Sequence, residues 1–131
     1  MGKKSFVLAP EIYVAGSLSL GGPAAALFNA YVGMRDEVSF VVSAWVQSEL
    51  TQLLQSHRLD AARAAEQASF VCSLCKMSDF QAADGDDPLA GLAKANGLDT
   101  VYCVGERAGT EADGVRFVAV SELLAELGVA S

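Results

Sequence analysis

The chain has 131 residues, of which 52% are hydrophobic, too many for an intrinsically disordered protein and enough for one domain with one core. It carries 16 acidic and 9 basic residues and a formal net charge of −7, which disfavours nucleic-acid binding through a broad basic surface. A metal-dependent nuclease remains compatible with this charge, because its metal-binding pocket is itself acidic. We expect residues 1–131 to form a single domain.

The start of the chain and the cysteines indicate the cellular compartment. No apolar stretch reaches the roughly 18 uncharged residues of a membrane-spanning helix. The opening residues resemble a secretion signal, but Glu11 interrupts the apolar run early, and we interpret the segment as a first strand. The three cysteines are too few and odd in number for a disulfide framework, so we expect a cytoplasmic protein.

The first half of the chain predicts strands that alternate with helices. Short apolar runs rich in β-branched residues predict buried strands. Pro23 is suited to the first turn of a helix, and Ser43 and Asp60 are suited to N-cap positions. The expected strands cover residues 5–9 and 39–42, and the expected helices cover residues 23–32, 43–55 and 60–75. Residues 11–20 are expected to form a loop or a helical turn, and residues 77–81 a short extended segment.

An acidic turn, a short helix and a buried strand follow between residues 84 and 107. Asp84, Asp86 and Asp87 directly precede Pro88, and acidic residues and proline are both favoured at the beginning of a helix. Asn96-Gly97 is a stop signal for that helix.

The strand after this helix is expected at residues 100–104, and it ends in Gly105-Glu106. A polar turn at 109–114, a strand at 115–120 and a helix from Ser121 to Gly128 complete the chain. Strands separated by helices imply a parallel sheet that is covered on both faces. The expected fold class is therefore α/β, a three-layer α/β/α sandwich with a mainly parallel central sheet. Ligands of open α/β sheets bind outside the carboxyl ends of the strands. Acids at the beginning of a helix and at the carboxyl end of the next strand can therefore converge on one point at that edge of the sheet.

Five short motifs in this order resemble those of the PIN domain. That fold belongs to small metal-dependent nucleases and includes the toxin half of many bacterial toxin–antitoxin pairs. The motifs are LAPEI at the first strand end with Gly-Gly-Pro further on, SAWVQSEL, DDPLA, VGE and the terminal GVRFVAVSELLAEL. The first begins at residue 8, with its Gly-Gly-Pro at residue 21, and the other four begin at residues 43, 86, 104 and 114.

The resemblance implies a cluster of carboxylates that binds Mg²⁺ or Mn²⁺, hard cations that take oxygen ligands. The family's second, third and fourth acids correspond to Glu49, Asp86 and Glu106, with Asp87 as the alternative to Asp86. In an active member these residues would be both metal ligands and catalytic groups, because the ion activates a water for attack on phosphorus. The implied substrate is RNA. The implied partners are an antitoxin-like protein or a second copy, with DNA unexpected.

The first acid of the family is missing. Ala9 stands in its place, and alanine cannot bind a metal ion. Glu11 replaces an asparagine of the family motif and is a possible substitute ligand, although Pro10 restricts the backbone beside it. At the fourth position, Val104 and Glu106 replace threonine and aspartate, and the longer glutamate side chain shifts the carboxylate outward.

Two hypotheses follow from these departures. The first is a degenerate PIN-like domain with an eroded active site that acts through binding. The second is an active Mg²⁺- or Mn²⁺-dependent endoribonuclease, a toxin in which Glu11 or Glu106 compensates for Ala9. An unrelated α/β domain is the third reading.

Four further residues have a structural and a functional interpretation. Cys72 and Cys75 share a helix face and are expected to pack in the core, with a redox pair or half a zinc site as alternatives. Trp45 is expected in the core rather than in contact with RNA bases. Arg107 adjoins Glu106 and could contact a phosphate. The helix that ends at Cys75 is either buried in its own domain or part of an interface.

Overall fold

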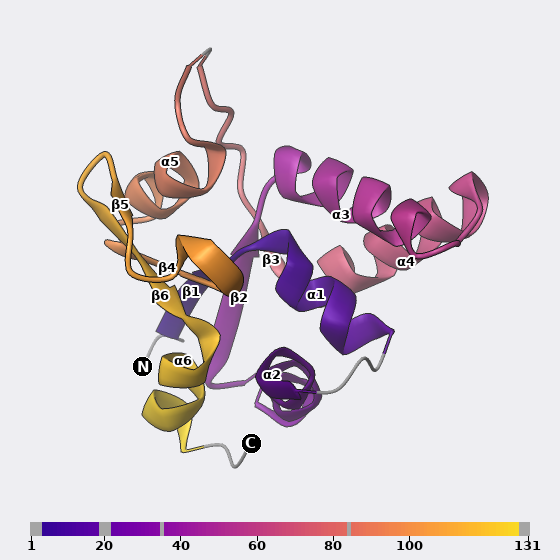
Figure 1. The fold of residues 1–131 in the computed structure, drawn as a ribbon, viewed down its shortest axis with the longest axis horizontal. Coiled ribbons are helices and arrows are strands. Elements are labelled where there is room, and N and C mark those ends of the chain that lie inside the picture. Colours follow the sequence, from indigo (N-terminus) through magenta and orange to yellow (C-terminus); the bar gives the residue numbers. More distant parts are fainter. Residues whose placement is uncertain (1–3, 19–21, 35, 84, 129–131) are drawn as a thin grey trace.

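The computed structural model of the chain describes residues 4–18, 22–34, 36–83 and 85–128. Its elements alternate between strand and helix along most of the chain (Figure 1). The strands are β1 Lys4–Leu8, β2 Val38–Val42, β3 Lys76–Met77, β4 Thr100–Cys103, β5 Glu111–Ala112 and β6 Val115–Ala119. The α-helices are α1 Pro10–Ser17, α2 Gly22–Gly33, α3 Ala44–Ser56, α4 Ala61–Ser73, α5 Pro88–Ala95 and α6 Val120–Leu127, and a 3₁₀ helix, η1, covers Gly105–Arg107.

The strands form one sheet in the order β3-β2-β1-β4-β6-β5. All neighbouring pairs are parallel except β5 and β6, which form an antiparallel hairpin. Strand β1 lies in the middle, where Phe6 is opposite Phe40 of β2 and Leu8 is opposite Tyr102 of β4. The predicted α/β fold class with a mainly parallel sheet is confirmed.

Helices cover both faces of the sheet. On one face, Tyr13 of α1 and Tyr31 of α2 pack against Phe40, with ring centroids 6.4 and 4.0 Å apart. On the same face, the Tyr102 hydroxyl donates a hydrogen bond of 3.1 Å to Glu126 of α6. Helix α5 packs against β1, β4 and β6 from the other side (Figure 1).

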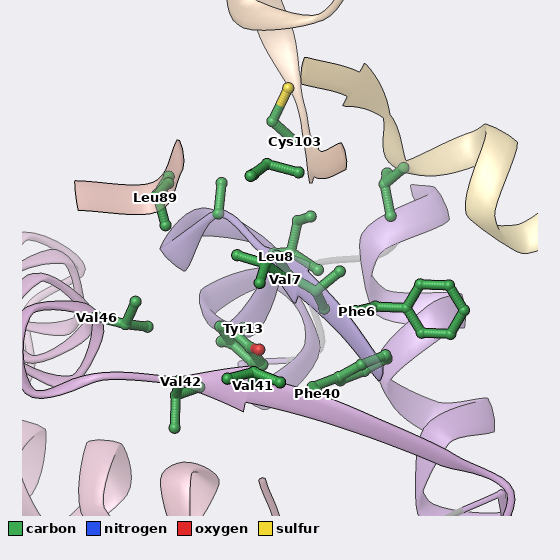
Figure 2. Packing of buried hydrophobic residues seen from close by; sticks show 14 of the residues in the cluster. Phe6, Val7, Leu8, Tyr13, Phe40, Val41, Val42, Val46, Leu89 and Cys103 are labelled. Carbon is green, nitrogen blue, oxygen red and sulfur yellow. The ribbon is translucent and has the colours of Figure 1, made fainter. Parts of the chain in front are cut away.

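The centre of the core is the middle of β1. Figure 2 shows Val7 and Leu8 between Val41 of β2 on one side and Cys103 of β4 on the other, with Leu89 of α5 nearby. All five side chains are buried. The carboxyl end of β1 is therefore held in a fixed position by the core around it.

The segment after β1 differs from its expectation as a loop or a single helical turn. Residues Pro10–Ser17 form a helix of two turns, α1. Pro10 suits its first turn, because its fixed φ is already helical and its missing N–H is not needed there. Ile12, Tyr13 and Val14 are buried, so tertiary packing decides the conformation of a segment with mixed local signals. Residues 19 and 20 lie outside the described part.

The last helix begins earlier than expected. Strand β6 ends at Ala119 and α6 begins at Val120, with Ala119 at the N-cap and no side-chain cap bond, so the expected cap at Ser121 is wrong. Val120, which was expected to end the strand, is instead the first residue of the helix and is buried. Gly128 ends the helix in the left-handed conformation, as its position predicts.

Two other helices begin at their predicted caps. The Ser43 hydroxyl accepts a hydrogen bond of 3.3 Å from the Val46 N–H, and the Asp60 carboxylate accepts one of 2.8 Å from the Arg63 N–H. The expected burial of Trp45 is wrong, because its side chain is 38% exposed while the neighbouring Val46 takes the inward direction.

Among the described residues, no helix is both long and apolar enough to cross a bilayer. Cys72 is buried and Cys75 is half-buried, and neither takes part in a disulfide. The expected packing of Cys72 in the core is confirmed.

The contact between α1 and α2 provides a test of this packing. A Cβ at Gly16 would lie 2.2 Å from the Cβ of Phe28, which cannot move without the backbone of α2. We expect Gly16→Ala to lower the free energy of unfolding by about 1–3 kcal/mol, measured by urea denaturation.

Gly33→Ala is the matched control, because this helical glycine has nothing within 4 Å of the added Cβ. We expect it to be neutral or to raise stability by up to about 1 kcal/mol. Equal losses in the two variants would contradict the close approach of α1 and α2.

Candidate functional site

The candidate site lies at the carboxyl ends of β1 and β4. The N–H of Ala9, directly after β1, donates a hydrogen bond of 2.8 Å to the Tyr102 carbonyl of β4. Helix α1 begins on one side of this junction and η1 follows β4 on the other. Ligands of open α/β sheets bind at such strand ends.

Ala9 is the N-cap residue of α1 and is only 2% exposed. Its methyl group belongs to the hydrophobic core, and its side chain makes no cap bond. The position at which the PIN resemblance requires the first carboxylate is therefore buried and apolar.

Glu11 follows in the first turn of α1 and is partly buried. It lies close enough to Cys103 for its charge to act on the thiol. Burial raises the pKa of Cys103, the Glu11 carboxylate raises it further, and the Arg107 guanidinium opposes this effect. Glu11 and Arg107 thus flank the same strand end.

Asp87 is the N-cap residue of α5, and both of its carboxylate oxygens have partners. The Oδ1 atom accepts hydrogen bonds of 3.0 Å from the Leu89 N–H and 3.1 Å from the Ala90 N–H. The Oδ2 atom pairs with Nη2 of Arg107 at 2.5 Å. Burial alone would raise the pKa of the Asp87 carboxyl, but the bonds from Ala90 and Arg107 outweigh burial and hold the pKa below its ordinary value.

Arg107 is held in place by an aromatic ring as well as by Asp87. The carbon at the centre of its guanidinium lies 3.7 Å from the centroid of the buried Phe117 ring of β6, a stacked cation–π arrangement. The backbone around Arg107 is tied to the same strand, because the Gly109 N–H bonds the Phe117 carbonyl at 2.7 Å. Gly105 begins this turn at φ 77°, a value that favours glycine.

The structure brings only some of the sequence-derived site residues to this end of the sheet. Glu11 in α1, the alternative acid Asp87 at the start of α5 and Glu106 in η1 are there. Asp86 is exposed and instead lines a hollow with Phe80 and Lys94.

Glu49 is partly buried in the middle of α3, and Glu106 is exposed in η1. Among the described residues, no three side chains of His, Cys, Asp or Glu are grouped to hold a metal ion. Asp84 lies outside the described residues.

A divalent metal ion does not fit these residues as they are arranged. Mg²⁺ and Mn²⁺ need several oxygen ligands, of which carboxylates supply the charge. Ala9 offers no ligand, and both oxygens of Asp87 are already engaged. Sequence reasoning missed the contact of Arg107 with Asp87 and Phe117, because neither spacing along the chain nor residue type indicates it.

The ion pair of Asp87 makes stability depend on pH in acid. The pKa of the Asp87 carboxyl is lower in the folded state than its unfolded-state value of about 3.8. The charged carboxylate therefore stabilises the fold above about pH 3.8, and this stabilisation is lost as the pH falls through the folded-state pKa. Asp87→Asn keeps a cap residue but removes the charge. We expect it to lower the free energy of unfolding by about 1 kcal/mol or less at pH 7, with the difference shrinking below about pH 3.8 and vanishing below the folded-state pKa of Asp87.

Urea denaturation at a series of pH values measures this difference. Asp86→Asn removes the same charge from an exposed neighbour and should leave stability nearly unchanged at pH 7. A loss for Asp87→Asn that does not depend on pH would contradict the ion pair.

No family model and no curated protein matches the sequence. Two solved structures are similar in fold. One is a chain of VapBC2 from Rickettsia felis, crystallised with a DNA fragment from the promoter, with a TM-score of 0.61, 12% identity and coverage of 88% of this chain and 98% of that one. The other is PAE2754 from Pyrobaculum aerophilum, with a TM-score of 0.61, 17% identity and coverage of 96% and 90%. VapC is a PIN-domain toxin, and the present chain has a PIN-like fold.

Proposed function

We propose that this chain is a PIN-like protein related to metal-dependent toxin ribonucleases, with an eroded active site and a role in binding. The observation that carries this proposal is the buried methyl group of Ala9 at the end of the central strand. An alanine removes the carboxylate around which the family's metal cluster is built. The commitment of Asp87 to the start of α5 and to Arg107 removes a second ligand.

A protein is the partner that we favour. The similar chain from Rickettsia felis belongs to a toxin–antitoxin complex, which makes an antitoxin-like partner reasonable for this chain. The net charge of −7 favours a basic segment of such a partner, since complementary charge guides association. RNA is less favoured by this charge, and DNA is not proposed as a ligand of this chain.

Large apolar side chains available to a partner occur on three consecutive elements of the chain. Trp45 lies on α3, Phe70 on α4 and Met77 on the edge strand β3, and Phe70 and Met77 are 58% and 47% exposed. Helices α3 and α4, which carry two of these side chains, lie side by side (Figure 1). Light scattering measures the molar mass in solution and distinguishes two kinds of partner. If the wild type has the mass of a dimer and Phe70→Ser lowers that mass, the partner is a second copy of the chain. If the wild type is a monomer, an antitoxin-like protein is the partner that we favour.

The proposed compartment is the cytoplasm, where the thiols of Cys72 and Cys103 stay reduced.

The alternative function is an active Mg²⁺- or Mn²⁺-dependent ribonuclease in which Glu11 or Glu106 replaces the missing acid. We favour Glu11 over Glu106, because Glu11 is partly buried in the first turn of α1, close after the central strand, whereas Glu106 is exposed. A metal ion bound by Glu11 would still lack the carboxylate ligand that other family members have at the position of Ala9.

An RNA cleavage assay decides between the two functions. We expect the wild-type chain with Mg²⁺ or Mn²⁺ to cleave single-stranded RNA no faster than Glu49→Ala, because no metal-activated water can form without the carboxylate cluster. Denaturing gel electrophoresis of end-labelled RNA measures the rate. Cleavage that Glu11→Gln and Glu49→Ala both abolish would overturn the binding role and establish the ribonuclease.

A further inference from the structure

We propose that Arg107 is a built-in cation that takes the place of a divalent metal ion at the carboxyl end of the sheet and keeps Asp87 from binding one. This inference rests on the proposed function and gives a physical reason for the eroded site. It assigns to one arginine of this chain a role that is distinct from contact with a phosphate. Arg107 acts as a positioning residue, through Asp87.

The first step is the occupation of the Asp87 carboxylate. Its Oδ1 atom bonds two backbone N–H groups of α5, and its Oδ2 atom bonds the guanidinium. Because Oδ1 already accepts two bonds, a metal ion at Asp87 would have to bind Oδ2 beside the guanidinium. The positive charge of Arg107 would repel it there.

The second step is the fixed position of the guanidinium. Phe117 supports one face of it, and the Phe117 ring is itself buried. The backbone carbonyl of Arg107 accepts bonds from both the N–H and the hydroxyl of Thr110, at 3.0 and 2.7 Å. Arg107 is therefore held by ring and backbone contacts in addition to the ion pair, as a resident cation must be.

The third step is the number of ligands that each cation needs. A divalent ion needs several oxygen ligands, whereas this guanidinium is satisfied by one carboxylate and one ring. One carboxylate suffices for arginine, whereas the described residues offer no group of three His, Cys, Asp or Glu side chains that could hold a metal ion.

The test compares the thermal stability of four proteins with Mn²⁺ and with a chelator. They are the wild type, Ala9→Asp, Ala9→Asp/Arg107→Met and the control Ala9→Asp/Arg116→Met. Methionine keeps apolar contact with Phe117 but removes the charge. Arg116 is exposed on the neighbouring position of β6, so its loss changes net charge equally without freeing Asp87.

We expect only Ala9→Asp/Arg107→Met to respond, with a saturable rise in Tm of about 5 °C or more once Mn²⁺ exceeds its Kd about a hundredfold. Adding Asp87→Asn to that variant should abolish the response. Circular dichroism confirms that each variant is folded, and Arg107→Gln replaces Arg107→Met if the latter unfolds.

Two results would overturn the role of Arg107. One is an equal Mn²⁺ response in Ala9→Asp alone, which would show that arginine does not block the site. The other is a folded double variant that does not respond. A rise in the Tm of the wild type with Mn²⁺ would instead show that the metal site is not eroded. That result would contradict the proposed function and differs from the two results that contradict the role of Arg107.

Discussion

The carboxylate of Asp87 is the point at which the second half of the fold is tied together. Through Oδ1 it begins α5, and through Oδ2 it holds Arg107, which rests on Phe117 of β6. The chain from residue 87 to 117 thus closes on itself through one side chain. A helix cap is typically worth about 1 kcal/mol, and a half-exposed ion pair less, so the importance of Asp87 is geometric.

This arrangement changes the chemistry that the fold permits. A PIN-like sheet places its strand ends where carboxylates can converge on a metal ion, but in this chain Ala9 adds to the core and Asp87 faces an internal cation. Glu11 and Glu106 remain nearby, without a grouped third ligand among the described residues. The strand ends of this sheet therefore carry an ion pair between Asp87 and Arg107.

Much of the fold could be predicted because the signals are local. The β-branched runs of β2 and β4, the caps Ser43 and Asp60 and the stop at Gly128 depend on residues within one turn of the element they define. Helix α1 could not be predicted as well, because its conformation depends on packing against α2 and the sheet. For the same reason, the sequence could not predict the ion pair of Asp87, since its partner Arg107 lies 20 residues further on.

Electron paramagnetic resonance of Mn²⁺ tests the central claim most directly, because the signal of free hydrated Mn²⁺ disappears when the ion is bound. Titration of the wild-type chain with Mn²⁺ should leave that signal undiminished at every ratio, since Asp87 is engaged by Arg107 and Ala9 provides no ligand. Loss of one equivalent of signal, restored by Asp87→Asn, would show that a metal centre survives and would contradict an eroded site occupied by Arg107.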